Sequence, residues 1–199
     1  MVSRAAPEAL FPDRFWTRDL ELLRWDARFA DDMVRAIASS FDELRKWMPW
    51  AISVPTIDEM RTTLEQGNSR FGSNEDWPYV VCGQRGELVG STGLHRRSGP
   101  DVVEIGYWIR SDWTGQGYAT AVAKALTDAA FERDPRIGRV EISTHERNAA
   151  SQAVARKLGY EVVREVPKGS QGSVPGGTFL IWSVDRAAWP HESASNASS

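Results

Sequence analysis

The chain has 199 residues, 41% of them hydrophobic and 26% charged, a balance typical of a soluble globular protein. Its formal net charge of -3 argues against a general nucleic-acid-binding protein, which normally carries a strongly basic face. A single cysteine excludes an intrachain disulfide and argues strongly against a cysteine-based zinc site. No stretch approaches the roughly 18 apolar residues of a membrane-spanning helix, so we expect a cytoplasmic protein.

The first half of the chain predicts one strand followed by helices. Residues 19–25 (DLELLRW) alternate in part and are expected to form the first strand. Asp26 is expected to cap a helix that runs to about residue 40, and a second short helix, FDELRKW, stops before a proline. Thr56 is followed three residues later by a glutamate, which predicts a capping box and a helix running towards residue 67.

The second half predicts strands with two intervening helices. Residues 77–97 contain two apolar runs joined by the turn GQRG, and DVVEIGYWIR predicts a third strand. Further along come a helix from residue 118 to about residue 132, the strand RVEISTH, the helix NAASQAVARKLGY and two closing strands, EVVREV and TFLIWSV. We expect an α/β or α+β layer in one domain over residues 1–188, with a polar, disordered tail over residues 189–199.

Two closely spaced glycines mark the junction between the third of these strands and the helix that follows. In RSDWTGQGYATA, Gly115 and Gly117 precede the first helical turn, whose unpaired N–H groups favour a phosphate. A phosphate loop of the Walker type requires a Lys-Ser/Thr pair that is missing, and a dinucleotide fingerprint requires a third glycine where Thr120 stands. A purely structural turn is the remaining alternative.

Three motifs in order, EIGYWI, GQGYAT and NAASQAVARKLGY, together resemble the GNAT family of N-acetyltransferases. The segment LRKWMPWA is similar to the branch that acetylates ribosomal-protein N-termini, the RimJ/RimL-like enzymes. The resemblance covers roughly residues 19–185. It implies a mixed, mostly antiparallel sheet of about six to seven strands flanked by helices, with a splayed strand pair at the acyl-CoA site.

The resemblance also implies acetyl-CoA as cosubstrate, with its pyrophosphate on the loop 112–118 and its pantetheine arm beside the strand 102–109. The residues assigned to acyl-CoA in this way are Trp108, Ile109, Arg110, Gly115, Gln116, Gly117, Tyr118, Ala119, Thr120, Asn148 and Ser151. The family pattern has a hydrogen-bond donor where this chain has Asp112. We expect Arg110 to offset that carboxylate.

Two residues are candidates for the chemistry of acyl transfer. Strand alternation places Glu104 on one face with Gly106 and Trp108, and it is the candidate general base, with a salt bridge or a solvated edge position as the alternative. Ser151 is the candidate acid, because the resembling branch uses serine there and the tyrosine of the wider family is replaced by Ala155. Its alternative roles are to hydrogen-bond the thiolate, to position a water molecule, or to be simply a small polar residue in the first turn of the helix.

Other reactive side chains are expected to be structural. Cys82 lies in the apolar run YVVC and is interpreted as a small buried hydrophobe. His145 is expected to be structural or solvated, Tyr160 is expected to pack in the core, and the histidine spacing indicates no metal site.

The sequence therefore predicts an acetyl-CoA-dependent N-acetyltransferase acting on a primary amine. Three acceptor classes stay open: a protein N-terminus, an antibiotic or aminoacyl small molecule, and a polyamine or amino acid. The alternatives are a transferase that uses another acyl-CoA, such as succinyl-CoA, and a non-catalytic acyl-CoA-binding module. The acceptor is expected to enter beside Trp47–Trp50, with the loop 168–177 as another wall; neither nucleic acid nor membrane is expected as a partner, and a homodimer fits the resemblance.

Overall fold

The computed structural model describes residues 9–97, 99–169, 174 and 176–190. Its strands are β1 (Arg14–Thr17), β2 (Leu20–Arg24), β3 (Asp76–Gly83), β4 (Leu88–His95), β5 (Val102–Ile109), β6 (Arg139–His145), β7 (Glu161–Lys168) and β8 (Gly177–Asp185). Its α-helices are α1 (Ala30–Trp47), α2 (Ile57–Gly72), α3 (Tyr118–Arg133) and α4 (Ala149–Lys157). Three short 3-10 turns, η1 (Ala27–Phe29), η2 (Ser111–Trp113) and η3 (Arg186–Ala188), complete the described elements.

The strands form one sheet in the order β1-β2-β3-β4-β5-β6-β8-β7. Every neighbouring pair is antiparallel except β5 and β6, which are parallel. The expected mixed, mostly antiparallel sheet is confirmed, with eight strands in place of six to seven. The additional strand is β1, which reaches β2 through a turn where Arg18 has φ 50°. Sequence reasoning missed this turn because arginine does not signal the left-handed conformation.

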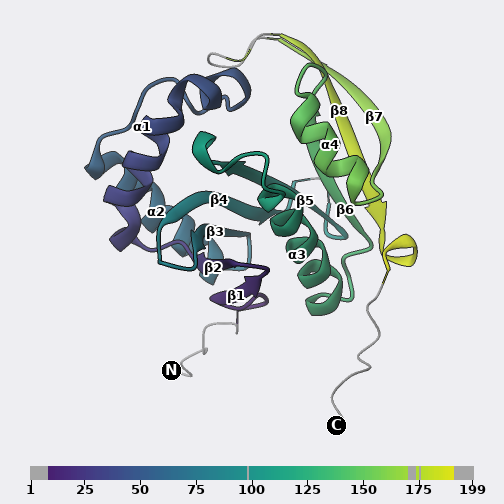
Figure 1. Ribbon diagram of the computed structural model, residues 1–199. Helices are drawn as coiled ribbons and strands as arrows, with labels where there is room; N and C mark the ends of the chain where they lie inside the picture. The colour runs from purple at the N-terminus through teal and green to yellow at the C-terminus, as the bar shows by residue number, and fades with distance from the viewer. Residues whose placement is uncertain (1–8, 98, 170–173, 175, 191–199) are drawn as a thin grey trace, which may run out of the picture.

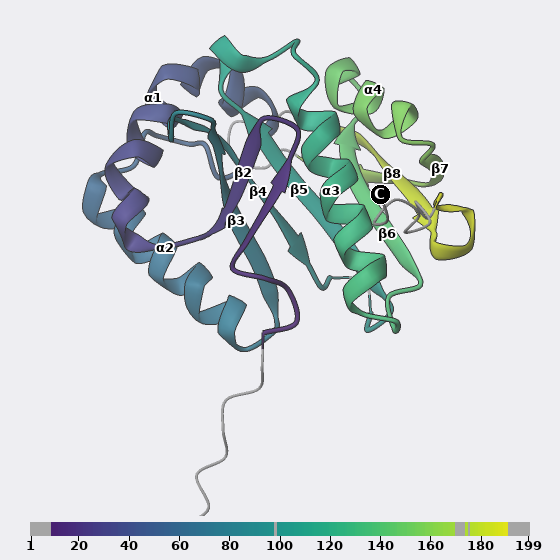
Figure 2. The ribbon, with the colours of Figure 1, turned by 60° about the horizontal axis from the view of Figure 1, so that its bottom comes forward.

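Helices cover both faces of the sheet, as Figures 1 and 2 show, with α1 and α2 on one face and α3 and α4 on the other. On the first face Met33, Ile37 and Leu64 pack with Val80 and Leu88. On the second face the core has its largest cluster, which includes Val103 and Ile105 from β5 and Val122 and Leu126 from α3. Trp108 of β5 packs with the first of these clusters and Ile109 with the second, so adjacent residues of this strand serve two different cores, as strand alternation requires.

The helix boundaries confirm most of the cap predictions and correct one. Thr56 and Glu59 form the capping box of α2, and the Asn148 side chain accepts a hydrogen bond from the backbone N–H of Ser151 at the start of α4. The two helices predicted over residues 26–47 were wrong: Asp26 caps only the turn η1, and α1 is one uninterrupted helix of 18 residues. Ser40 does not break it, because this serine is buried and its hydroxyl accepts the backbone N–H of Ser111.

Trp189 belongs to the core although its sequence position suggested the start of the tail. Its side chain is 4% exposed and lies against Phe131 and Tyr160, and its indole N–H donates to Asp128 Oδ1 at 2.8 Å. The packed chain therefore extends at least to this residue. The rest of the predicted tail, from residue 191, lies outside the described residues.

Asp134, directly after α3, is a buried residue that binds arginine side chains from three different segments of the chain. Its side chain is 1% exposed and accepts hydrogen bonds from Arg96 at 2.6 Å and from Arg136 at 2.8 Å. Its backbone carbonyl accepts from Arg186. The hydrogen bond from Arg136 is the main reason that the pKa of Asp134 falls to about 2, against the opposing effect of burial.

Because the folded pKa of Asp134 lies below its ordinary value of 3.8, its contribution to stability is complete above about pH 5 and is lost as the pH falls towards 2. We expect Asp134→Asn to lower the free energy of unfolding at pH 7 by on the order of 1 kcal/mol, allowing for solvent screening. The deficit should shrink as the pH falls from 5 to 2. Urea unfolding at pH 7, 4 and 2.5 measures it, and a deficit independent of pH would contradict this assignment.

Candidate active site

The site begins where the parallel strands β5 and β6 separate. The two strands pair only through Val102–Glu104 and Arg139–Glu141, and although both are described in full, no pairing follows. On their outer sides β5 stays paired with β4 as far as Ile109, and β6 stays paired with β8 as far as His145. The facing backbone groups beyond Glu104 are therefore free to bind an extended, peptide-like ligand. This is the predicted splayed pair.

The loop after β5 leads to the N-terminus of α3. Gly115 and Gly117 have φ values of 77° and 81°, and Gly117 is the N-cap of α3 without a side-chain cap. In the described part of the chain, no group accepts a hydrogen bond from the backbone N–H of Gly115, Gln116 or Gly117. A Cβ on Gly115 would meet no atom within 4 Å. Tyr118, Ala119 and Thr120 form the half-buried first turn behind this open backbone, which fits a pyrophosphate.

Arg110 holds the shape of this loop. Its guanidinium donates to both carboxylate oxygens of Asp112, at 3.1 and 2.6 Å, and to the backbone carbonyl of Leu88 at 3.0 Å. The carboxylate that departs from the family pattern is thus paired, as we expected from the sequence. Arg18 approaches from the β1–β2 turn and donates to the carbonyl of Gln116 at 3.1 Å, so a second cation lies beside the glycines.

Ser151 lies in the first turn of α4, on the other side of the splay. Its hydroxyl is 2.8 Å from the hydroxyl of Tyr107, and its backbone N–H is bound by Asn148. Burial raises the pKa of Tyr107 to about 12, with the hydrogen bond to Ser151 acting in the opposite direction. Sequence reasoning did not single out Tyr107. The alternation of β5 was its only signal, since it directs this side chain towards α3 and α4.

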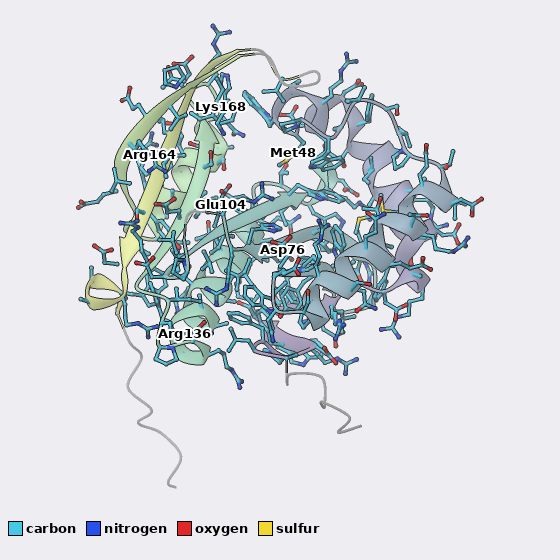
Figure 3. The ribbon with its side chains drawn as sticks, turned by 180° about the vertical axis from the view of Figure 1, so that it is seen from behind. Met48, Asp76, Glu104, Arg136, Arg164 and Lys168 are labelled. Carbon is cyan, nitrogen blue, oxygen red and sulfur yellow. The ribbon has the colours of Figure 1, made fainter. Side chains whose placement is uncertain are left out.

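Glu104 lies at the last position of β5 that pairs with β6, and it faces the α1 and α2 side. It is half-buried, and no ion pair or hydrogen bond of its side chain is recorded in the described parts of the chain. The salt bridge considered as its alternative role is therefore not formed with any described residue. In Figure 3, Glu104 lies near the middle of the view, with Met48 on one side, Arg164 on the other and Lys168 above it.

Aromatic side chains from α1 and the segment after it border the same face. The ring of Trp50 lies 6.3 Å from that of Trp108, and the ring of Trp47 lies 5.9 Å from that of His145. Trp108 packs against the core beneath α1 and α2, whereas Ile109 packs on the opposite face. The segment 50–57 exposes four large apolar side chains, Trp50, Ile52, Val54 and Ile57. The predicted second wall, 168–177, lies partly outside the described residues.

The remaining reactive side chains are buried. Burial raises the pKa of Cys82 to about 11, so this thiol is unsuited to act as a nucleophile. The hydroxyl of Tyr160 is within 2.7 Å of the Thr127 hydroxyl, and burial raises its pKa. His145 is 3% exposed, and its Nδ1 accepts the backbone N–H of Arg147. Across the described ranges no group of three His, Cys, Asp or Glu side chains is placed to hold a metal ion. No helix in those ranges is long and apolar enough to cross a membrane.

This combination of a splayed parallel pair, an open helix N-terminus and a mostly antiparallel sheet defines the class of protein. The family model described as an acetyltransferase (GNAT) domain matches residues 19–161, and the chain belongs to this family.

Individual relatives share this fold at low sequence identity. The "Putative ribosomal N-acetyltransferase YdaF" of Bacillus subtilis (strain 168) is 28% identical over 132 residues, which are 66% of this chain and 72% of the relative. A structure of RimL, a ribosomal L7/L12 alpha-N-protein acetyltransferase in complex with coenzyme A, matches with a TM-score of 0.77 and 20% identity, covering 88% of this chain and 97% of that one. The microcin C7 self-immunity acetyltransferase MccE, in complex with acetyl-CoA and AMP, matches with a TM-score of 0.80 and 19% identity, covering 89% and 98%. The acetyl-CoA predicted from the sequence fits the family and these ligands.

The contact between Tyr107 and Ser151 has a measurable energy. We expect Tyr107→Phe and Ser151→Ala to show a coupling energy of about 1 kcal/mol in a double-mutant cycle, since each variant removes the same hydrogen bond. Urea unfolding of the four proteins measures it. Tyr79 serves as the control, because its hydroxyl donates to the carbonyl of Pro12 instead. Tyr79→Phe and Ser151→Ala should be additive, and equal coupling in both cycles would contradict the contact.

Proposed function

We propose that this chain transfers an acetyl group from acetyl-CoA to a primary amine by direct attack of the amine on the thioester. The observation that carries the proposal is the splay between β5 and β6, which opens beside Glu104 and next to the N-terminus of α3. The backbone of residues 105–109 is positioned to pair with the pantetheine arm. The free N–H groups of the loop 115–119 are positioned to bind the pyrophosphate.

Bound acetyl-CoA supplies the activated acyl group, and the chain supplies proton transfer and orientation. Glu104 accepts a proton from the acceptor ammonium, directly or through water, because only the neutral amine is nucleophilic. Ser151 lies across the splay and donates a hydrogen bond to the departing thiolate. Tyr107 holds the Ser151 hydroxyl at 2.8 Å. The high intrinsic pKa of a hydroxyl favours stabilisation of the thiolate over full proton donation.

Glu104→Gln tests the role of the carboxylate. It keeps the shape of the side chain and removes the base, so we expect kcat at pH 7 to fall at least about 100-fold, with the Kd for acetyl-CoA unchanged. Thiol release and calorimetry measure the two quantities. Glu132→Gln, at an exposed glutamate at the end of α3, is the matched control and should retain full activity. Full activity in Glu104→Gln would remove this residue from the mechanism.

Gly115→Ala tests the binding loop against a control with the same backbone. Gly115 and Gly86 have φ values of 77° and 80°, and a Cβ on either meets no atom within 4 Å. We expect both alanine variants to lose a similar stability, about 1 kcal/mol, because both place a side chain in the left-handed region. Only Gly115→Ala should weaken acetyl-CoA binding, by tenfold or more, because its Cβ enters the pyrophosphate site. Equal affinities in the two variants would show that the loop is not that site.

The donor and acceptor are tested together by a thiol-release screen. Acetyl-CoA and succinyl-CoA are each offered with short peptides, aminoacyl nucleosides, polyamines and amino acids. We expect release with acetyl-CoA and at least one amine class, and the relatives named for ribosomal proteins make peptides with a free α-amine the first to test. Tight binding of acetyl-CoA without release across the panel would favour a non-catalytic binding module. Release with succinyl-CoA alone would show that the acyl donor is succinyl-CoA and not acetyl-CoA.

A further inference from the structure

A row of polar side chains crosses the sheet beside the splay. Asp76 of β3 is the register partner of His95 of β4, and His95 is the register partner of Glu104 of β5. Directly paired residues of neighbouring strands project from the same face, so these three side chains lie side by side on the α1 and α2 face. The sequence does not reveal this row, because the two intervals between its members are 19 and nine residues long and neither carries a motif.

Asp76 orients the imidazole of His95. Nδ1 of His95 lies 3.0 Å from Oδ1 of Asp76. Burial alone would raise the pKa of Asp76, but the hydrogen bond from His95 and the charges of His95, Arg70 and Arg97 outweigh it and lower the pKa. An ionised carboxylate only accepts hydrogen bonds, so Nδ1 carries the hydrogen, and in the neutral ring Nε2 presents a lone pair.

The free Nε2 of His95 lies over Gly93 of β4 and Gly106 of β5, and Gly106 borders the splay. A Cβ on Gly93 would come within 3.3 Å of Nε2, and a Cβ on Gly106 within 3.5 Å. Gly106 lies two residues after Glu104 on the same face, at the point where β5 has left β6. No protein group in the described ranges hydrogen-bonds Nε2. The ring thus presents a basic nitrogen above the position where the thioester is expected.

We propose that His95, held by Asp76 as its positioning residue, is a second proton acceptor for the acceptor amine, alongside Glu104. The inference rests on the proposed acetyltransferase function. In the step, the ammonium gives one proton to Glu104, the amine nitrogen forms a bond to the acetyl carbon, and the carbon–sulfur bond breaks. Nε2 of His95 takes the second amine proton, and the thiolate sulfur takes up one proton. The net reaction therefore delivers one proton to solvent.

The charges around His95 favour this role. Asp76 faces it from β3 and Glu104 from β5, while Arg70 of α2 reaches Asp76 at 3.6 Å and Arg97 follows the end of β4. The arginines help to keep Asp76 ionised, so its carboxylate remains an acceptor for the hydrogen on Nδ1. Imidazole is also a stronger base than a carboxylate, with ordinary pKa values of about 6.5 and 4.3, and so is better matched to an ammonium.

The decisive variant is His95→Asn. An asparagine amide reaches the position of Nδ1 and keeps the hydrogen bond to Asp76 but has no atom at Nε2, so a structural role is preserved and the base is lost. We expect kcat to fall about 100-fold with the acceptor KM and the acetyl-CoA Kd unchanged. The kcat of His95→Ala should fall at least as far. Added imidazole should restore its activity in proportion to the concentration of unprotonated imidazole. The kcat of Asp76→Asn should fall about tenfold, since this variant leaves Nε2 in place but no longer fixes the orientation of the ring.

The outcomes separate this inference from the function on which it rests. Wild-type protein that releases no thiol with any amine contradicts the proposed function, and the role of His95 falls with it. Active wild-type protein together with a His95→Asn variant of equal kcat overturns the role of His95 and leaves the proposed acetyltransferase function standing. Failure of added imidazole to restore a folded His95→Ala variant overturns the role of His95 in the same way. If His95→Ala fails to fold, His95→Asn with its kcat and KM remains decisive.

Discussion

The single parallel pair in the sheet is the constraint on which the site depends. β5 and β6 pair over three residues and then part, although each remains held on its outer side by an antiparallel neighbour. The outer strands fix the separation, so the gap is built into the fold and needs no ligand to open it. Because parallel strands end at the same edge, α3 and α4 begin at that edge too. The glycine loop and the Asn148 cap are therefore brought to one place by strand direction alone.

The splay also divides the chemistry between the two faces of the sheet. Glu104 and His95 project towards α1 and α2, whereas Tyr107 projects towards Ser151 and α4. Alternation along β5 produces this division within four residues. The proposed proton acceptors and the proposed hydroxyl donor thus border the same gap from opposite faces of the sheet. They do not contact one another, and a thioester lying in the gap would be reached by both.

The sequence predicted those features that depend on local order. The glycine loop, the two side-chain caps and the alternation of β5 follow from neighbouring residues, as does the pairing of Asp112 with Arg110. The strand β1 was missed because its turn uses an arginine in a left-handed conformation. The break predicted near Ser40 was wrong because that serine is buried by a contact with Ser111, 71 residues away. The row from Asp76 to Glu104 depends on strand register, which no single segment encodes.

The local charges suggest how an acceptor is selected. Of the carboxylates near the splay, Asp76 is paired with His95 and Arg70, and Glu141 lies within 3.4 Å of Arg139 and 3.7 Å of Arg164. Glu104 has no such partner among the described residues, so its charge acts on whatever enters. An amine therefore arrives most favourably as the ammonium, which cannot attack the thioester until it loses a proton. Under the proposed mechanism, attraction and deprotonation of the amine fall to the same side chains, and the exposed apolar segment 50–57 borders that face of the sheet.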